Sequence, residues 1–197
     1  MDSGRRQFIG RFAAALTGVA VPFPVPDGPL PEGHDRFMRL AVAEARKNPQ
    51  WPFGAVIVHA RTGEILGSGV NTGDVSPVLH GEMVAMNDYV SRQGNQGWSD
   101  TTLYTTAEPC SMCMSAMAWA NLRRVVWGSS IDEIRRTGVI QIDLTARQVA
   151  ASASSFYSPE LLLGGVLAQH TNRLFEEAQR LRRESARPEV RAGAAGL

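Results

Sequence analysis

The order of hydrophobic and polar positions along the chain predicts helices that alternate with strands. Apolar residues recur at helical spacing between Asp35, the expected N-cap, and Asn48, where a following proline ends the helix. Continuous or β-branched apolar runs predict strands, and clusters of Gly, Asp, Ser and Pro separate them. The expected helices cover 35–48, 80–91, 109–120, 130–136 and 165–184, and the expected strands cover 53–59, 64–70, 101–106 and 123–128.

This alternation indicates a three-layer α/β domain, with helices on both faces of a sheet. In the last expected helix, Leu167, Leu174 and Leu181 repeat every seven residues and are predicted to share one buried face. The five prolines between Pro22 and Pro31 exclude regular structure and indicate a linker. We therefore expect a leader and linker over 1–31, one domain over 32–186, and a flexible Ala/Gly-rich tail over 187–197.

Composition and net charge limit the kinds of partner that the chain is expected to bind. The 197 residues are 44% hydrophobic, which fits a folded domain with a sizeable core, and the net charge is +1. A chain so nearly neutral lacks the electrostatic footprint of a protein that binds a long polyanion. Binding of a long nucleic acid is therefore not expected, and a small molecule is the favoured partner.

The first residues predict an export signal. Arg5-Arg6-Gln7-Phe8-Ile9 is followed by an apolar stretch over 12–21, which resembles a twin-arginine signal. The stretch is too short for an ordinary transmembrane helix, so no stable membrane anchor is expected. The sequence therefore predicts that the protein is exported to the periplasm. The alternative is that these residues form a basic N-terminal helix and that the protein is cytoplasmic.

The two cysteines of the chain provide its most specific chemistry. Cys110 and Cys113 follow Pro109 at the start of an expected helix, so both sulfurs are predicted to project from its first turn. The positive end of the helix favours thiolates, the form that ligates metals. A redox pair of the C-x-x-C type is the alternative.

Upstream, His80 and Glu82 lie two residues apart. Such residues point to different sides of a regular helix, so they converge on one site only at a helix start. His80, Cys110 and Cys113 would hold a zinc ion with one position free for water. Glu82 would then move protons between that water, a ring nitrogen and a departing amine. The alternative is a closed structural zinc site with Glu82 as the fourth ligand.

The pattern H-x-E…P-C-x-x-C, as His80-Gly81-Glu82 and Pro109-Cys110-Ser111-Met112-Cys113, is typical of zinc nucleobase deaminases. With the 101–106 strand, it makes residues 35–136 resemble the cytidine and deoxycytidylate deaminase superfamily. The resemblance implies a mixed five-stranded sheet with helices on both faces, and a homodimer.

Within that superfamily the chain is most similar to the guanine-deaminase-like branch, through the segments 52–56 and 118–120. The sequence His-Gly-Glu, with the segment 100–104, is also similar to yeast-type cytosine deaminases. Asp132, Glu133 and Asp143 are candidates for an acidic residue that reads the substrate. The resemblance implies that the substrate contacts Phe53, Asn71 and Trp119, and that it faces the backbone at Ala107 and Glu108, before Pro109.

The sequence therefore predicts a zinc-dependent hydrolytic deaminase of a free nucleobase or nucleoside, with guanine-like purines favoured over cytosine. The first alternative is a tRNA-specific adenosine deaminase, for which Leu181-Arg182-Arg183 provides a faint cationic helix end. The second alternative is a zinc fold without catalytic activity.

Overall fold

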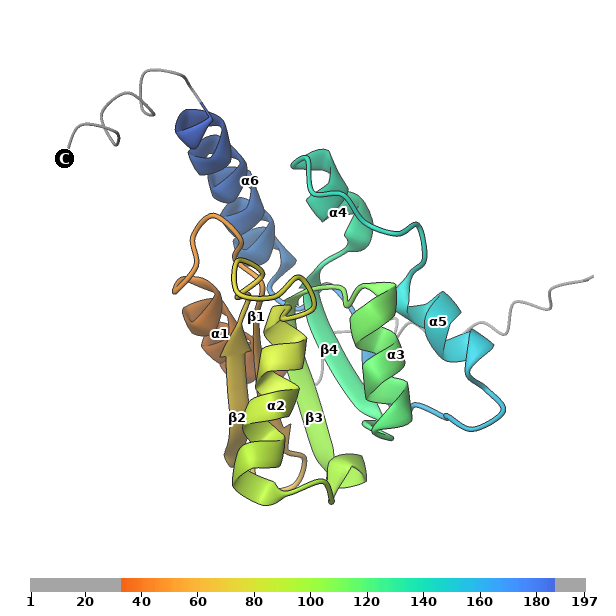
Figure 1. Cartoon of the computed structure of the whole chain (residues 1–197). Coiled ribbons are helices and arrows are strands. Elements are labelled where there is room, and N and C mark those ends of the chain that lie inside the picture. Colours follow the sequence, from red (N-terminus) through yellow and green to blue (C-terminus); the bar gives the residue numbers. More distant parts are fainter. Residues whose placement is uncertain (1–32, 187–197) are drawn as a thin grey trace, which may run out of the picture.

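The structure, a computed structural model, describes residues 33–186. The expected leader, linker and tail lie outside this range. Among the described helices, none is long and apolar enough to cross a membrane. Figure 1 shows one layered domain that begins with α1 and ends with α6.

A five-stranded mixed sheet forms the centre of the domain, in the order β2-β1-β3-β4-β5. β1 pairs antiparallel with both β2 and β3, whereas β3, β4 and β5 run parallel. The carboxyl ends of β3 and β4 therefore lie at the same edge of the sheet (Figure 1). The strands are β1 (Gly54–His59), β2 (Ile65–Val70), β3 (Thr101–Ala107), β4 (Arg124–Ser129) and β5 (Leu161–Leu163).

Helices cover both faces of this sheet. α1 (His34–Ala45) packs on one face, where α6 (Ala168–Ser185) also contacts β4. The opposite face is covered by α2 (Gly81–Gln93), α3 (Ser111–Trp119) and α5 (Ala146–Ser152). A short 3-10 turn, η1 (Trp98–Asp100), leads into β3, and α4 (Ile131–Arg136) follows β4. The predicted three-layer α/β/α architecture is confirmed.

Close backbone packing fixes the entrance to β1. A Cβ atom on Gly54 would lie 2.3 Å from the backbone nitrogen of Ala45 and 2.4 Å from the carbonyl oxygen of Ala41. α1 therefore contacts the strand directly, through its backbone. This contact places the loop between α1 and β1 above the edge where the metal ligands gather.

Several element boundaries differ from the sequence prediction. α1 begins at His34 with Gly33 as its N-cap, so Asp35 lies inside the first turn rather than at the cap. α3 begins one residue after Cys110, so Pro109 precedes the N-cap instead of occupying the first helical position. α5 and β5 were not predicted, because seven and three residues are too few to show a hydrophobic period.

The predicted leucine face of the last helix was wrong. The buried residues of α6 are Thr171, Phe175 and Ala178, which follow the i, i+4, i+7 spacing of one helical face. Leu167 is not in the helix; it is the N-cap, with a left-handed φ of 53°. Leu174 and Leu181 do share one side of the helix, where both line a single cavity, but each is only half-buried.

Candidate metal centre

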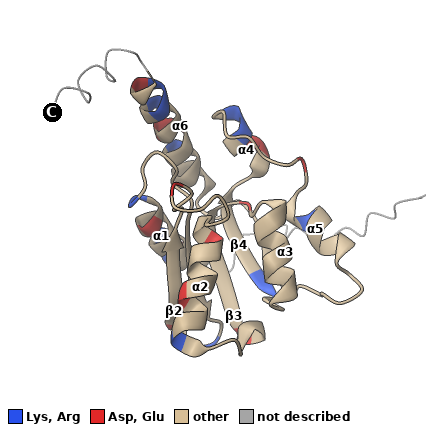
Figure 2. Cartoon of the chain, viewed as in Figure 1, with Lys and Arg blue, Asp and Glu red and all other residues tan. Residues whose placement is uncertain are grey.

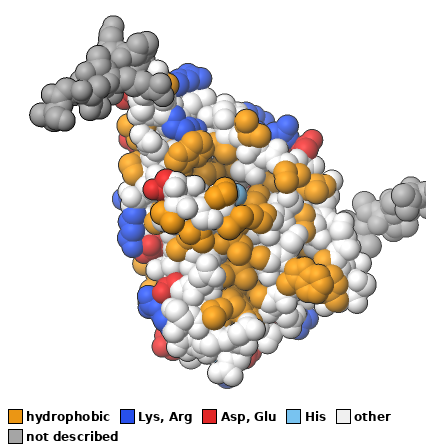
Figure 3. Space-filling view, viewed as in Figure 1, with side chains coloured by type: hydrophobic (Ala, Val, Ile, Leu, Met, Phe, Trp, Pro, Cys, Tyr) orange, Lys and Arg blue, Asp and Glu red, His pale blue; other side chains and the backbone are white. Residues whose placement is uncertain are grey.

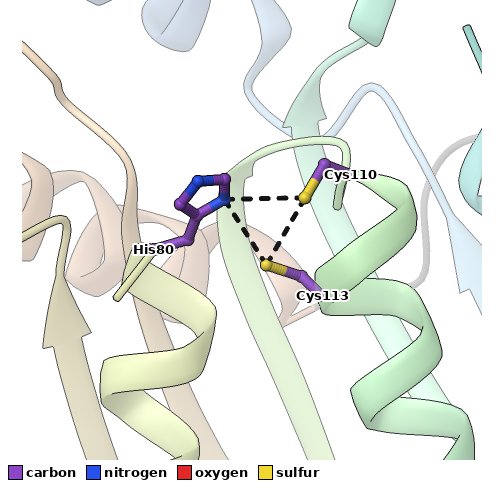
Figure 4. A group of neighbouring side chains, drawn as sticks. All are labelled: His80, Cys110 and Cys113. Carbon is purple, nitrogen blue, oxygen red and sulfur yellow. Dashed lines mark hydrogen bonds between the residues drawn. The ribbon is translucent and has the colours of Figure 1, made fainter. Parts of the chain in front are cut away.

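Three side chains from two helix starts converge on one point, as Figure 4 shows. His80 is the N-cap of α2 and has an extended backbone, with φ −64° and ψ 159°. Cys110 is the N-cap of α3, also extended, and Cys113 lies in the first turn of that helix. Two N-termini are thus aimed at the same place, and their partial positive charge favours thiolates there.

The three ligand atoms form a nearly equilateral triangle. The Sγ atoms of Cys110 and Cys113 are 3.6 Å apart, and His80 Nδ1 lies 3.5 Å and 3.6 Å from them. Tetrahedral zinc, with ordinary Zn–S and Zn–N bonds, requires about 3.8 Å between sulfurs and about 3.6 Å between sulfur and nitrogen. The donor set and the triangle therefore fit a zinc ion with three protein ligands and a fourth position open.

The sulfurs are not bonded to each other, so a disulfide is excluded in this structure. The hydrogen bond with Cys113 holds the pKa of the Cys110 thiol at about 4, despite burial. The hydrogen bond with Cys110 raises the pKa of the His80 imidazole above its usual value. These two effects favour a Cys110 thiolate beside a protonated His80 imidazole. A bound metal cation would take the place of that proton as the positive charge beside the thiolate.

Glu82 lies on the first turn of α2, directly beside the triangle. Its side chain is 3% exposed, and burial raises the pKa of its carboxyl group. Thr105 on β3 donates a hydrogen bond of 3.2 Å to Glu82 Oε1, while Oε2 lies 3.7 Å from Cys113 Sγ. A buried carboxyl group with a raised pKa, held by a hydroxyl, is suited to accept and return a proton.

A cavity of about 610 Å³ opens onto His80. Its walls come from the loop between α1 and β1 and from the loop between β2 and α2. Among the described residues that line the cavity, only His80 and Asp74 can carry a charge. The lining residues are Asn48, Gln50, Trp51, Asn71, Gly73, Asp74, Pro77 and His80.

Three of the residues expected to contact substrate lie at or beside this centre. Asn71 lines the cavity, and its Oδ1 accepts a hydrogen bond from Gly73 N. The Phe53 ring lies roughly parallel to the His80 imidazole, with centroids 6.4 Å apart. Ala107, fully buried, ends β3 next to the loop that carries Cys110.

The structure does not bring the side chains of the other two to the cavity. Glu108 points away: its carboxylate accepts hydrogen bonds from Ile131 N and Ala146 N, at 3.1 Å and 2.9 Å. Trp119 ends α3, about 13 Å along the helix axis from Cys110. It is 77% exposed and stacks on Phe156.

The acidic candidates also lie outside the cavity lining. Glu133 pairs with Arg136, and Asp143 pairs with Arg135 at 2.7 Å. Asp132 does not line the cavity either. The acidic side chain that does is Asp74, which the sequence analysis missed.

Sequence reasoning missed four wall residues with a polar or aromatic side chain and one support of Glu82. Asn48, Gln50 and Trp51 were assigned to a helix end and its exit. The signal for Thr105 was present, since a fully buried strand with several threonines must find partners for their hydroxyls. The missed residues are Asn48, Gln50, Trp51, Asp74 and Thr105.

Comparison with known proteins agrees with this geometry. Residues 31–129 match the model of the cytidine and deoxycytidylate deaminase zinc-binding region. A tRNA-specific adenosine deaminase of Streptococcus pyogenes is 41% identical over 99 residues, which cover 48% of this chain and 61% of that protein. One of Rickettsia typhi is 30% identical over 146 residues, covering 71% of this chain and 93% of that one.

Solved structures share the fold. The guanine deaminase of Nitrosomonas europaea superposes with a TM-score of 0.64, over 80% of this chain and 87% of that one, at 19% identity. A structure from a study of A-to-I editing by tRNA:A34 deaminases has a TM-score of 0.56 and 24% identity, over 71% and 98% of the chains.

The chain spans about three-fifths of the length of the streptococcal relative. The region that matches the family model, residues 31–129, contains all three metal ligands and Glu82. The donor triangle and the family match agree on zinc, which confirms the predicted metal. The chain belongs to the cytidine and deoxycytidylate deaminase superfamily, whose zinc-binding region it carries.

Proposed function

We propose that the protein is a zinc-dependent hydrolytic deaminase of a free nucleobase or a nucleoside without phosphate. His80, Cys110 and Cys113 hold the ion, and Glu82 moves protons. Two observations support the proposal: the donor triangle with a buried carboxylate beside it, and the absence of Lys and Arg among the described residues that line the cavity.

The reaction exchanges an exocyclic amine for a carbonyl oxygen. Zinc, when bound, supplies Lewis-acid activation and lowers the pKa of water toward about 7. Glu82 accepts the proton of the attacking water and passes it to the ring nitrogen next to the reacting carbon. Glu82 then takes the second proton of that water, now on the hydroxyl group of the reacting carbon, and delivers it to the amine. The carbonyl forms as the C–N bond breaks and ammonia leaves. Thr105 keeps the carboxylate aimed through Oε1 during these transfers.

Charge distribution favours a small uncharged substrate over a polynucleotide. Figure 2 shows that acidic and basic residues alternate along the ribbons of α6 and α4. Several cations have acidic partners within the chain: Lys47, just before the loop that lines the cavity, pairs with Glu44, and Arg135 and Arg136 on α4 are paired as described above. A tRNA backbone needs free Lys and Arg side chains to neutralise its phosphates.

The second candidate is a tRNA-specific adenosine deaminase. The Streptococcus pyogenes and Rickettsia typhi relatives both carry that name, and sequence comparison favours this activity over a free-base one. Structural likeness does not choose between the two, because the two solved structures described above are each below 25% identical to this chain. The preference for guanine-like purines stays a prediction.

A substrate panel decides between the two. The zinc-loaded protein is incubated with guanine, guanosine, adenine, cytosine, cytidine and an adenosine-containing tRNA anticodon stem-loop, and ammonia release and inosine formation are followed. We expect turnover of at least one free base or nucleoside and none of the RNA. Inosine formation in the RNA alone, weakened by added salt, would establish the second candidate instead.

We also propose periplasmic export through the paired Arg5 and Arg6, which would separate the protein from tRNA. The check is cell fractionation of the full chain and its Arg5→Lys/Arg6→Lys variant. The expected result is periplasmic wild-type protein and a retained variant. Cytoplasmic location of both would refute the proposal.

The homodimer likewise stays a prediction. Figure 3 shows hydrophobic side chains gathered on the face that carries α2 and α3. The exposed stack of Trp119 and Phe156, with ring centroids 4.6 Å apart, lies at the end of α3. A second copy would cover such a surface.

A further inference from the structure

The last turn of α6 is tied to the wall of the cavity by one arginine. Arg182 Nη1 donates a hydrogen bond of 2.6 Å to the carbonyl oxygen of Gln50, and Nη2 donates one of 3.0 Å to the carbonyl oxygen of Thr137. The guanidinium carbon lies 4.5 Å from the centroid of the Trp51 ring. Gln50 and Trp51 both line the cavity. The guanidinium group of Arg182 therefore contacts two neighbouring residues of the cavity wall.

Further hydrogen bonds extend this connection across the wall. Gln50 Nε2 donates to Ser185 Oγ at 3.0 Å, also in the last turn of α6. The backbone N–H of Trp51 donates to Asn48, and Asn48 Nδ2 donates to the carbonyl oxygen of Asn71 at 2.9 Å. The contacts thus run from α6 through the 48–51 loop to the residue after β2.

We propose that Arg182 is a positioning residue for the substrate: it orients Trp51 and the 48–51 loop as a wall against which a planar heterocycle packs. This inference rests on the proposed function. The guanidinium group lies over the indole ring, and Trp51 remains 41% exposed and lines the cavity. A planar base gains from packing on an aromatic ring that is already fixed.

The chemistry of arginine suits this task. Its planar group donates in two directions at once and stacks on an aromatic face, which the single ammonium of lysine does not reproduce. The same contacts bear on the second candidate function. Two of the five N–H donors of Arg182 are taken up by carbonyl oxygens of the chain, which leaves this cation only partly available to a phosphate. Of the arginine pair that suggested a cationic helix end, Arg183 is the exposed member.

The test compares three variants of the zinc-loaded full chain on the substrate that the panel identifies. Arg182→Met is expected to raise KM roughly tenfold or more while kcat changes less than about threefold, because the wall loosens and the metal centre does not. Arg182→Lys is expected to recover only part of the loss. Arg183→Met removes the same charge from the same helix turn and is expected to leave KM and zinc content unchanged.

A second measurement does not depend on activity. Hydrogen exchange of the peptide 46–53 is expected to accelerate in Arg182→Met and to match wild type in Arg183→Met. Unchanged exchange and KM in Arg182→Met, or equal effects in both methionine variants, would overturn the positioning role. If wild type turns over nothing in the panel, the proposed function fails, while the exchange experiment still decides whether Arg182 holds the wall.

Discussion

Glu82→Gln is expected to lower turnover by about 10²–10⁴-fold, the usual contribution of a general acid–base group, while zinc binding stays stoichiometric. The substitution keeps the shape of the side chain and leaves an amide oxygen to accept the hydrogen bond from Thr105. It removes only the ability to take up and release a proton. Ammonia release and elemental analysis of the same preparation measure both quantities.

The result also separates catalysis from structure. If Glu82 were the fourth ligand of a closed zinc site, Glu82→Gln would lose the metal along with any activity. Glu184→Gln is the matched control, because it neutralises an exposed carboxylate on α6, away from the centre. A fully active Glu82→Gln protein would contradict the proposed proton transfer.

The metal ligands could be predicted because their geometry is local. Cys110 and Cys113 share one helix start, and a helix start is also the only place where His80 and Glu82 can both approach one point. The structure shows both N-caps, with extended backbones at His80 and Cys110. Only the proximity of the two helix starts depends on the tertiary fold, and the set of ligand types, one histidine and two cysteines, implied that proximity.

The cavity wall could not be predicted in the same way. Trp51 and Asp74 lie in loops, and loop positions are set by distant partners such as Arg182, 131 positions after Trp51 in the chain. Glu108 shows the converse. The resemblance implied that its backbone faces the substrate, whereas its carboxylate has a structural role that the sequence did not indicate, since it accepts hydrogen bonds from backbone N–H groups at the starts of α4 and α5. Of these two helices, α4 was expected over 130–136, whereas α5 is too short to show a hydrophobic period in the sequence.

Cys113→Ser is expected to lose bound zinc and thermal stability together. The thiolate is the soft ligand, and a serine hydroxyl is a poor replacement at neutral pH. Cys113 is fully buried, so water cannot easily take its place. A ligand present at about 1,000 times its Kd stabilises by about 4 kcal/mol. Since each kcal/mol shifts Tm by about 2–4 °C in a domain of this size, we expect a Tm lower by roughly 10 °C.

Chelation of the wild-type protein provides the second arm of the comparison. If the destabilisation comes from the lost ion, chelator should lower the Tm of wild type by a similar amount, because zinc binding stabilises the folded state. Chelator should leave the Tm of Cys113→Ser unchanged. Ser111→Ala, between the two cysteines, should keep its zinc and respond to chelator as wild type does.

A Cys113→Ser protein that retains one zinc per chain would show that the ion is held elsewhere. A low Tm in Cys113→Ser that chelation of wild type does not reproduce would assign the loss to packing of the buried side chain rather than to the metal.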